Sequence, residues 1–235
     1  MTSHLSRRGF LGCLCCTGAA GIVLPSHRTF AATGPKTTMT PDQALAALKE
    51  GNDKFLTDAP YRQANDRDRR LEIARGQTPF AVLVSCSDSR VPPELLFGRG
   101  LGELFIVRNA GNTVDTTALG SIQYAVAELG VPLVVVLGHE RCGAVDAAVK
   151  VVKENATFPG AIGQMVESIV PAVLRAQSQQ GDLLDNAVRE NVRRTVNRLR
   201  TSEALFQELL RAGKLKIVGA RYDLDNGDVD FFDEG

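Results

Sequence analysis

Residues 80–85, Phe-Ala-Val-Leu-Val-Ser, and residues 133–137, Leu-Val-Val-Val-Leu, decide the fold of this chain. Each is a short, continuous apolar run rich in β-branched residues, which is typical of a strand buried on both faces. Similar runs occupy residues 104–107 and 215–222, and residues 229–232 are expected to add an edge strand. Helical patterns separate these runs. The chain is therefore predicted to be an α/β protein: a Rossmann-like three-layer domain with a mainly parallel sheet of four to five strands.

Eight helices are expected around this sheet. Thr40 is predicted to cap the first one, with Pro41 at its first helical position. The apolar residues from Ala44 to Leu56 lie on one side of this helix, so we expect it to pack on a partner subunit as a dimerisation helix. The other seven are expected near residues 62–75, 92–97, 116–129, 142–153, 162–177, 183–200 and 202–211. The domain then divides into an N-terminal helical arm, 41–75, and an α/β core, 76–235.

The first 31 residues read as a leader rather than as part of the fold. Arg7-Arg8 precedes an apolar stretch, residues 10–24, that is too short to span a bilayer comfortably. The segment from Ser6 to Leu11 resembles the twin-arginine export signal. We therefore expect a cleaved signal peptide over 1–31, a flexible tether over 32–40, a periplasmic or otherwise exported protein, and no membrane association of the mature form. The alternative is an amphipathic leader that is not cleaved.

The residue census after removal of the leader is informative. The whole chain has equal numbers of basic and acidic residues, and the mature form carries a net charge of −3. Neither net charge favours a nucleic-acid partner, and the sequence has no basic stripe. A small neutral or anionic substrate therefore fits better. Two cysteines and one histidine remain: Cys86, Cys142 and His139.

These three residues are expected to meet. Cys86 follows one predicted strand and His139 follows another, and parallel sheets place ligands at the carboxyl ends of their strands. Cys142 comes three positions after His139, a spacing that puts two residues on one face of a helix. Two thiolates and an imidazole suit one Zn²⁺ per chain, with a fourth position left for water or another side chain. Asp88, held by Arg90, is the candidate for orienting that water or for taking the fourth position itself.

Two strings of the sequence resemble the active-site signatures of β-class carbonic anhydrases. They are CSDSR at residues 86–90 and GHERCGAV at residues 138–145, and the similarity continues through residues 91–112 and covers roughly 41–232. The resemblance implies reversible hydration of carbon dioxide to bicarbonate and a proton by zinc-bound hydroxide. It also implies zinc ligation by the two cysteines and the histidine, with Asp88 and Arg90 as the catalytic pair.

Further roles follow from the resemblance alone. Gln77 matches a glutamine that binds substrate across a subunit interface in members with a permanently open site, and Gly143 matches a backbone N–H that binds the substrate oxygen. Phe105 and Tyr124 match aromatic positions at the carbon dioxide pocket. Leu83 stands where bicarbonate-regulated members carry tryptophan, so the resemblance is closer to the open, plant-like type. The assembly is expected to be a homodimer or homotetramer.

Other readings remain open at this level. Cys86 and Cys142 of an exported protein are also candidates for a disulfide. Asp88 and Arg90 are compatible with a plain loop ion pair, and Gln77 with a residue that ties down a loop. Rival functions are a hydrolase of carbon disulfide or carbonyl sulfide on the same fold, and a zinc- or bicarbonate-binding protein without catalysis. The glycine-rich segment 98–102 precedes a strand, whereas a dinucleotide fingerprint follows one, so it is interpreted as a turn.

Overall fold

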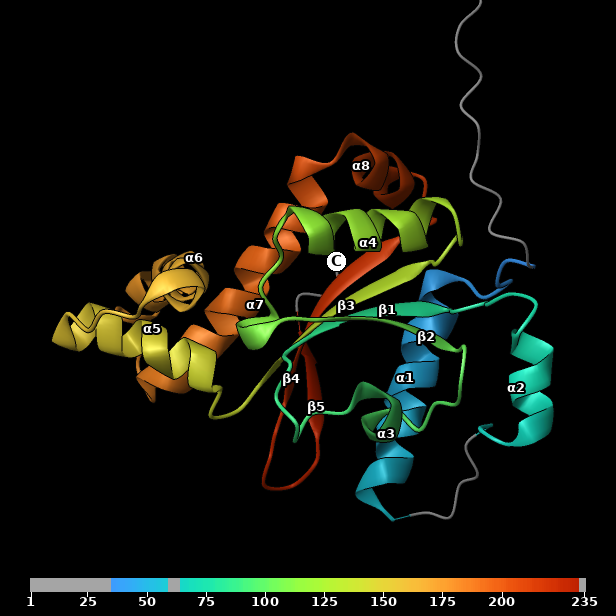
Figure 1. The fold of residues 1–235 in the computed structure, drawn as a ribbon, viewed down its shortest axis with the longest axis horizontal. Coiled ribbons are helices and arrows are strands. Elements are labelled where there is room, and N and C mark those ends of the chain that lie inside the picture. The colour runs from blue at the N-terminus through green and yellow to red at the C-terminus, as the bar shows by residue number, and fades with distance from the viewer. Residues whose placement is uncertain (1–34, 59–63, 233–235) are drawn as a thin grey trace, which may run out of the picture. The chain divides into compact units, whose positions relative to one another are not determined.

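The computed structural model describes residues 35–58 and 64–232, and the predicted leader lies outside them. The described residues form one five-stranded sheet at the centre of the fold, with the strand order β2-β1-β3-β4-β5 (Figure 1). The pairings are parallel except for β5, which runs antiparallel to β4 at the edge. The strands are β1 Ala81–Ser85, β2 Leu104–Arg108, β3 Leu133–His139, β4 Lys216–Tyr222 and β5 Val229–Phe232. The predicted α/β class and all five predicted strands are confirmed.

The helices match the predicted ones closely, with the largest difference in the second, which is shorter than the segment 62–75. Their bounds are α1 Pro41–Leu56, α2 Arg67–Ile73, α3 Pro93–Leu96, α4 Thr116–Ala127, α5 Gly143–Glu154, α6 Gly160–Ala176, α7 Leu183–Ser202 and α8 Ala204–Arg211, with a 3-10 helix at Ala110–Asn112. Thr40 caps α1 as expected, because its side chain accepts from the N–H of Gln43 and the Gln43 side chain accepts in return. Among the described residues, no helix is long and apolar enough to cross a membrane.

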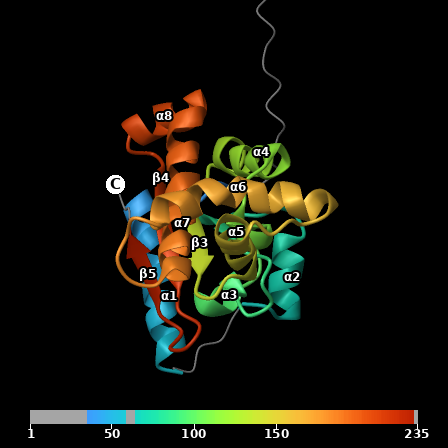
Figure 2. The ribbon, with the colours of Figure 1, turned by 90° about the vertical axis from the view of Figure 1, so that its left-hand side faces the viewer.

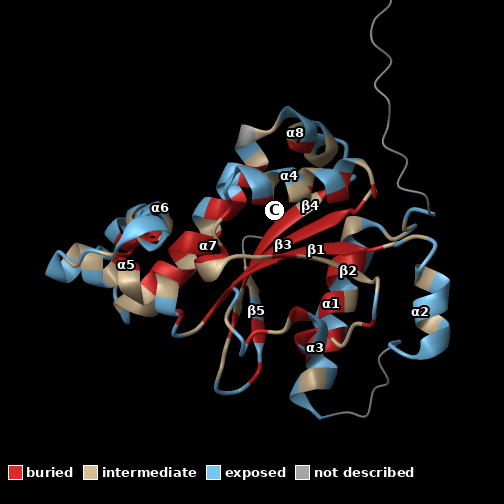
Figure 3. Ribbon diagram, viewed as in Figure 1, coloured by how far each residue is buried: buried red, intermediate tan, exposed pale blue. Residues whose placement is uncertain are grey.

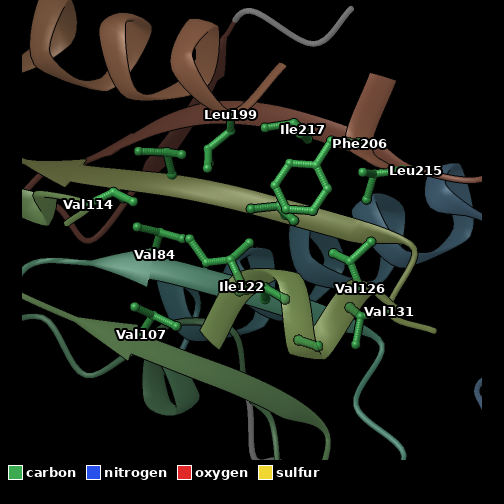
Figure 4. Packing of buried hydrophobic residues seen from close by; sticks show 14 of the residues in the cluster. Val84, Val107, Val114, Ile122, Val126, Val131, Leu199, Phe206, Leu215 and Ile217 are labelled. Atoms are coloured by element: carbon green, nitrogen blue, oxygen red, sulfur yellow. The ribbon is translucent and has the colours of Figure 1, made fainter. Parts of the chain in front are cut away.

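The sheet is buried on both faces, which explains the unbroken apolar runs in its central strands (Figure 3). Helices α4, α7 and α8 cover one face, where Val84, Ile122 and Phe206 pack together (Figure 4). Helices α1 and α3 cover the other face. The result is the three-layer arrangement predicted from the sequence.

The role expected for the apolar side of α1 is wrong. Ala44, Leu45 and Leu48 are fully or nearly fully buried against the sheet of their own chain, and Phe55 packs against the same cluster. Leu56 alone on this side remains exposed, at 39%. Helical periodicity shows that a side is apolar but not which surface covers it, so α1 gives no argument for a dimer.

A third group of helices stands beside the end of the sheet. Helices α5, α6 and α7 pack on one another around Val145, Ile169 and Val188, and Figure 2 shows them facing the viewer. This cluster also contains Cys86 and Cys142. The carboxyl ends of β1 and β3 are thus enclosed by helices, which removes the thiols from solvent.

Candidate metal centre

Neighbouring strands bring the first two predicted ligands together. β1 pairs with β3, and Ser85 lies opposite Leu137. Cys86 follows β1 directly and His139 is the last residue of β3, so both emerge at the same edge of the sheet. The convergence predicted from the strand ends is confirmed.

Cys142 reaches the same point for a different reason from the one expected. His139 is still in the strand, so the two residues do not share a helical face. A tight turn through Glu140 and Arg141 joins them, with Arg141 at a positive φ of 50°. Cys142 is the N-cap of α5, and the turn rather than helical spacing points its sulfur toward Cys86.

The three side chains form a compact donor set. The ligand atoms of Cys86, His139 and Cys142 lie within 4.8 Å of one another. All three residues are buried, and His139 is completely inaccessible. The two sulfurs are 4.0 Å apart and both cysteines are free thiols, so the alternative of a disulfide does not describe this structure. Two thiols and an imidazole at this separation suit the Zn²⁺ donor set.

The imidazole of His139 is oriented for ligation. Its Nδ1 is 2.8 Å from the backbone carbonyl oxygen of Glu140, which fixes the Nδ1–H tautomer by hydrogen bonding. Its Nε2 is buried and has no hydrogen-bond partner within the described part of the chain. A buried nitrogen lone pair without a partner is costly, and a cation beside the two sulfurs would satisfy it. The residues present therefore fit a zinc ion.

The thiols influence each other strongly. A hydrogen bond from Cys142, together with one from the N–H of Gly111, lowers the pKa of the Cys86 thiol to about 4. The same pairing with Cys86 raises the pKa of the Cys142 thiol. One thiolate thus opposes ionisation of the second, and a divalent cation between them would remove that conflict.

Asp88 and Arg90 form a bidentate pair beside the donor set. Arg90 donates from Nε to Oδ1 at 2.9 Å and from Nη2 to Oδ2 at 2.8 Å, and its backbone N–H also donates to Oδ1. These hydrogen bonds, those from the Arg90 side chain above all, hold the pKa of Asp88 well below its usual range. Oδ2 of Asp88 lies 3.8 Å from Nε2 of His139. An ionised, fixed carboxylate therefore faces the place where a metal would bind.

Backbone contacts hold the Cys86 loop in place. Arg108 on β2 donates to the carbonyl oxygens of Cys86, at 2.9 Å, and of Asp88, at 2.6 Å. The N–H of Gly111 donates to the sulfur of Cys86 at 3.2 Å, and Asn191 on α7 holds the carbonyl of Gly111 at 2.8 Å. Such outer contacts orient ligands and tune a metal site.

A second set of contacts holds the turn between His139 and Cys142. Arg141 forms a bidentate ion pair with Asp225 in the β4–β5 turn, at 2.9 and 2.6 Å. The Glu140 carboxylate accepts from the N–H of Leu224, and the N–H of Glu140 donates to the carbonyl of Tyr222. The C-terminal hairpin therefore supports the metal centre from outside.

Gly143 is the first residue of α5 and follows Cys142 directly. It is exposed, and a Cβ added there would meet nothing within 4 Å. Its position leaves open space beside the first N–H groups of the helix, where a small anionic group is favoured.

The other three predicted site residues are not brought to the ligands within one chain. Gln77 is exposed and precedes β1, whereas Cys86 follows it, and a five-residue strand spans about 17 Å. Phe105 pairs with Val82, three positions before the strand ends. Its ring meets that of Tyr124, which is 40% exposed, at 6.4 Å between centroids.

Sequence reasoning did not identify four supporting residues: Arg108, Gly111, Arg141 and Asn191. Arg108, Gly111 and Arg141 stand inside or beside the motifs, so their proximity to the ligands was a usable signal. Asn191 gave no signal, because it lies 80 residues from Gly111 in an ordinary helical segment.

The fold and the site together define a class: a three-layer α/β protein with a cysteine–histidine metal centre at the carboxyl edge of its sheet. The family model for carbonic anhydrase matches residues 81–229. Carbonic anhydrase 2 of Mycobacterium tuberculosis is 41% identical over 187 residues, which cover 80% of this chain and 90% of that protein. The chain belongs to the carbonic anhydrase family, in its β class, and is an enzyme whose family reaction is the hydration of carbon dioxide.

Solved structures agree with this assignment. The β-carbonic anhydrase CafA of Aspergillus fumigatus aligns with a TM-score of 0.63 at 26% identity, over 82% of this chain and 90% of that one. A tetrameric β-carbonic anhydrase of Sordaria macrospora aligns with a TM-score of 0.64 at 23% identity, over 70% and 85%. The second likeness shows the fold alone.

Proposed function

We propose that this chain hydrates carbon dioxide reversibly to bicarbonate and a proton with one zinc ion, held by Cys86, His139 and Cys142. The observation that carries the proposal is the buried donor set, with Nε2 of His139 unpartnered among the described residues and both sulfurs beside it. Zinc bound there would supply a Lewis acid that lowers the pKa of water to about 7. The set has three protein ligands, so the fourth position is open for that chemistry.

Asp88 and Arg90 supply the orientation. An ionised carboxylate only accepts hydrogen bonds, so Asp88 would fix the direction of an O–H group placed between it and the sulfurs. Arg90 occupies both oxygens of Asp88 and favours the arrangement in which Asp88 stays off the metal. This supports an open site over one closed by Asp88, in line with the open type that Gln77 and Leu83 suggest.

The proton released has few routes within the chain. His139 is the single histidine of the described residues, and it is taken as a ligand. Proton transfer therefore ends on water or buffer, and Asp88, whose pKa Arg90 holds low, would carry the proton only transiently.

We further propose that the active form is a homodimer or homotetramer. Gln77, Phe105 and Tyr124 lie away from the ligands of their own chain, so their expected roles require the site of a second copy. The tetrameric Sordaria macrospora protein gives a precedent for such an assembly. Light scattering of the purified protein measures the mass, and a monomer with full activity would refute this part.

Export is proposed from the leader alone. Substitution of Arg7 and Arg8 by lysine should retain the protein in the cytoplasm, and fractionation of the producing cells measures this. Equal export of the wild type and the lysine variant would exclude the twin-arginine route.

The main experiment measures zinc content and turnover together. Purified mature protein should contain one zinc per chain and hydrate carbon dioxide in a stopped-flow assay. Carbon disulfide and carbonyl sulfide are tested in parallel. One zinc per chain without hydration above pH 8 would favour a binding protein, and faster turnover of a sulfur compound would favour the rival hydrolase.

A further inference from the structure

A cavity away from the metal centre has an unusual charge. It lies between α6 and α7 and has a volume of about 410 Å³. Three arginines line it, Arg175 on α6 and Arg194 and Arg198 on α7, and none of its described lining residues is acidic. Guanidinium groups that share one cavity repel one another and create a positive potential there.

Two arginines of this cavity, Arg175 and Arg194, differ from nearby arginines of α7 in their ion pairing. Arg189 is paired with Asp185 and Asp230, and Arg193 with Glu190. In contrast, neither Arg175 nor Arg194 forms an ion pair with a described residue. Arg198 donates to the backbone carbonyl of Val114, which fixes its guanidinium at the cavity wall. Two uncompensated positive charges and one fixed donor group therefore face the same space.

Helical geometry explains why the donors converge. Arg194 and Thr195 lie three and four residues after Asn191, and Arg198 lies four and three residues after them, which places all four on one side of α7. Ser168 and Arg175 are seven residues apart on α6, so they also share a side. The two helices pack on each other, and their facing sides form opposite walls of the cavity.

We propose that this cavity binds a phosphate-type dianion. The planar guanidinium fork matches phosphate oxygens with two parallel hydrogen bonds, and two unpaired arginines balance two negative charges. The volume lies within the usual range of small-molecule pockets, about 300–1,000 Å³, so a phosphate monoester fits as well as free phosphate. The two sources share the same chemistry and differ in the group attached to the phosphate.

The cavity does not include the metal ligands, but a chain of hydrogen bonds connects its wall to one of them. Asn191 forms part of its wall and also holds Gly111, whose N–H donates to Cys86. An adjoining cavity of about 420 Å³ shares Thr113, Val114 and Ser168 with it and extends to Ala110. The proposal does not depend on the reaction at the metal.

Calorimetric titration of the zinc-loaded protein with inorganic phosphate tests this, at constant ionic strength set with chloride. The variant is Arg175→Gln with Arg194→Gln, and the matched control is Arg211→Gln, an exposed arginine on α8 outside the cavity. We expect one phosphate per chain for wild type and control, and binding weaker by about tenfold or more for the double variant. The single variant Arg194→Gln replaces it if the double variant melts earlier.

Two results would overturn the proposal: no phosphate binding to the wild type, or equal binding by all three proteins. The second would place the phosphate at the metal or elsewhere. A parallel titration with glycerol 3-phosphate separates the sources. Tighter binding than phosphate indicates a phosphate monoester as the natural ligand, and weaker binding indicates the free ion.

Discussion

The sequence predicted site residues both at the carboxyl edge of the sheet and around Gln77, Phe105 and Tyr124, but the structure brings only the first group together. At the carboxyl edge, Cys86, His139 and Cys142 are buried and within 4.8 Å of one another. In the second region, Gln77 is exposed at the far end of β1 and Tyr124 is 40% exposed. One chain therefore brings the metal-binding residues together, whereas the roles expected for Gln77, Phe105 and Tyr124 fit the proposal that a second copy completes the site.

The largest effect is expected at the carboxyl edge. Cys86→Ser replaces a soft thiolate ligand with a hydroxyl that binds zinc weakly, so we expect loss of the metal and activity at background. Elemental analysis and stopped-flow hydration measure both. Ser89→Ala in the same loop is the control and should retain both. Full zinc content in Cys86→Ser would remove this cysteine from the donor set.

Asp88→Asn separates chemistry from metal binding. The amide is nearly the same size but has lost the charge held by Arg90, and its NH₂ group donates where the carboxylate accepted. We expect full zinc content with turnover reduced by about 10²–10⁴-fold, the range for a proton-handling group.

Asp146→Asn on α5 is the matched control for Asp88→Asn, because Asp146 forms an exposed ion pair with Lys150. It should keep wild-type turnover. Wild-type activity in Asp88→Asn would mean that Asp88 and Arg90 form only an ion pair within the loop and have no catalytic role, which is the alternative that the sequence left open.

Gln77→Ala tests the second region. Loss of one hydrogen bond to substrate should lower kcat/KM by about tenfold without loss of zinc. A mixed dimer of two variants tests in addition whether Gln77 acts in the site of its own chain or in that of the partner. In a mixed dimer of Gln77→Ala and Asp88→Asn chains, one site has an intact Asp88 from the first chain and an intact Gln77 from the second. Activity above the sum of the separate variants is expected if Gln77 acts across the interface, and simple addition would place its role within one chain.

The sequence predicted the carboxyl edge well because two signals could be read from it directly. Continuous apolar runs marked β1 and β3, and their last residues were necessarily neighbours once the strands paired. The census of thiols and imidazoles left no other ligands after the leader. The second region was predicted from resemblance, which names residues but not the chain on which they act.

The wrong inferences share a physical cause. The apolar side of α1 was assigned to a partner, but it covers the sheet of its own chain. The spacing of His139 and Cys142 was read as helical, but it spans a strand end and a turn. In both cases a correct local pattern was completed by a tertiary contact that the pattern does not contain.

Asn191 also shows that local patterns do not contain tertiary contacts, and its substitution should have the smallest effect on turnover. Asn191→Ala removes the donor that holds the Gly111 carbonyl and leaves that buried oxygen unpaired, at a cost of about 1–3 kcal/mol in the free energy of unfolding. Gly111 has a φ of 66°, and in this conformation its N–H donates to the sulfur of Cys86. We therefore also expect zinc affinity to fall by about tenfold, as for other outer contacts of metal ligands.

Competition with a chelator measures the zinc affinity of Asn191→Ala, and thermal unfolding measures its stability. Asn197→Ala, an exposed site on the same helix, is the control for both measurements. Lower stability with unchanged zinc affinity would mean that Asn191 only supports the packing of α7 against the loop. A fall in both would show that the carboxyl edge depends on a contact 80 residues away, which no motif around Cys86 contains.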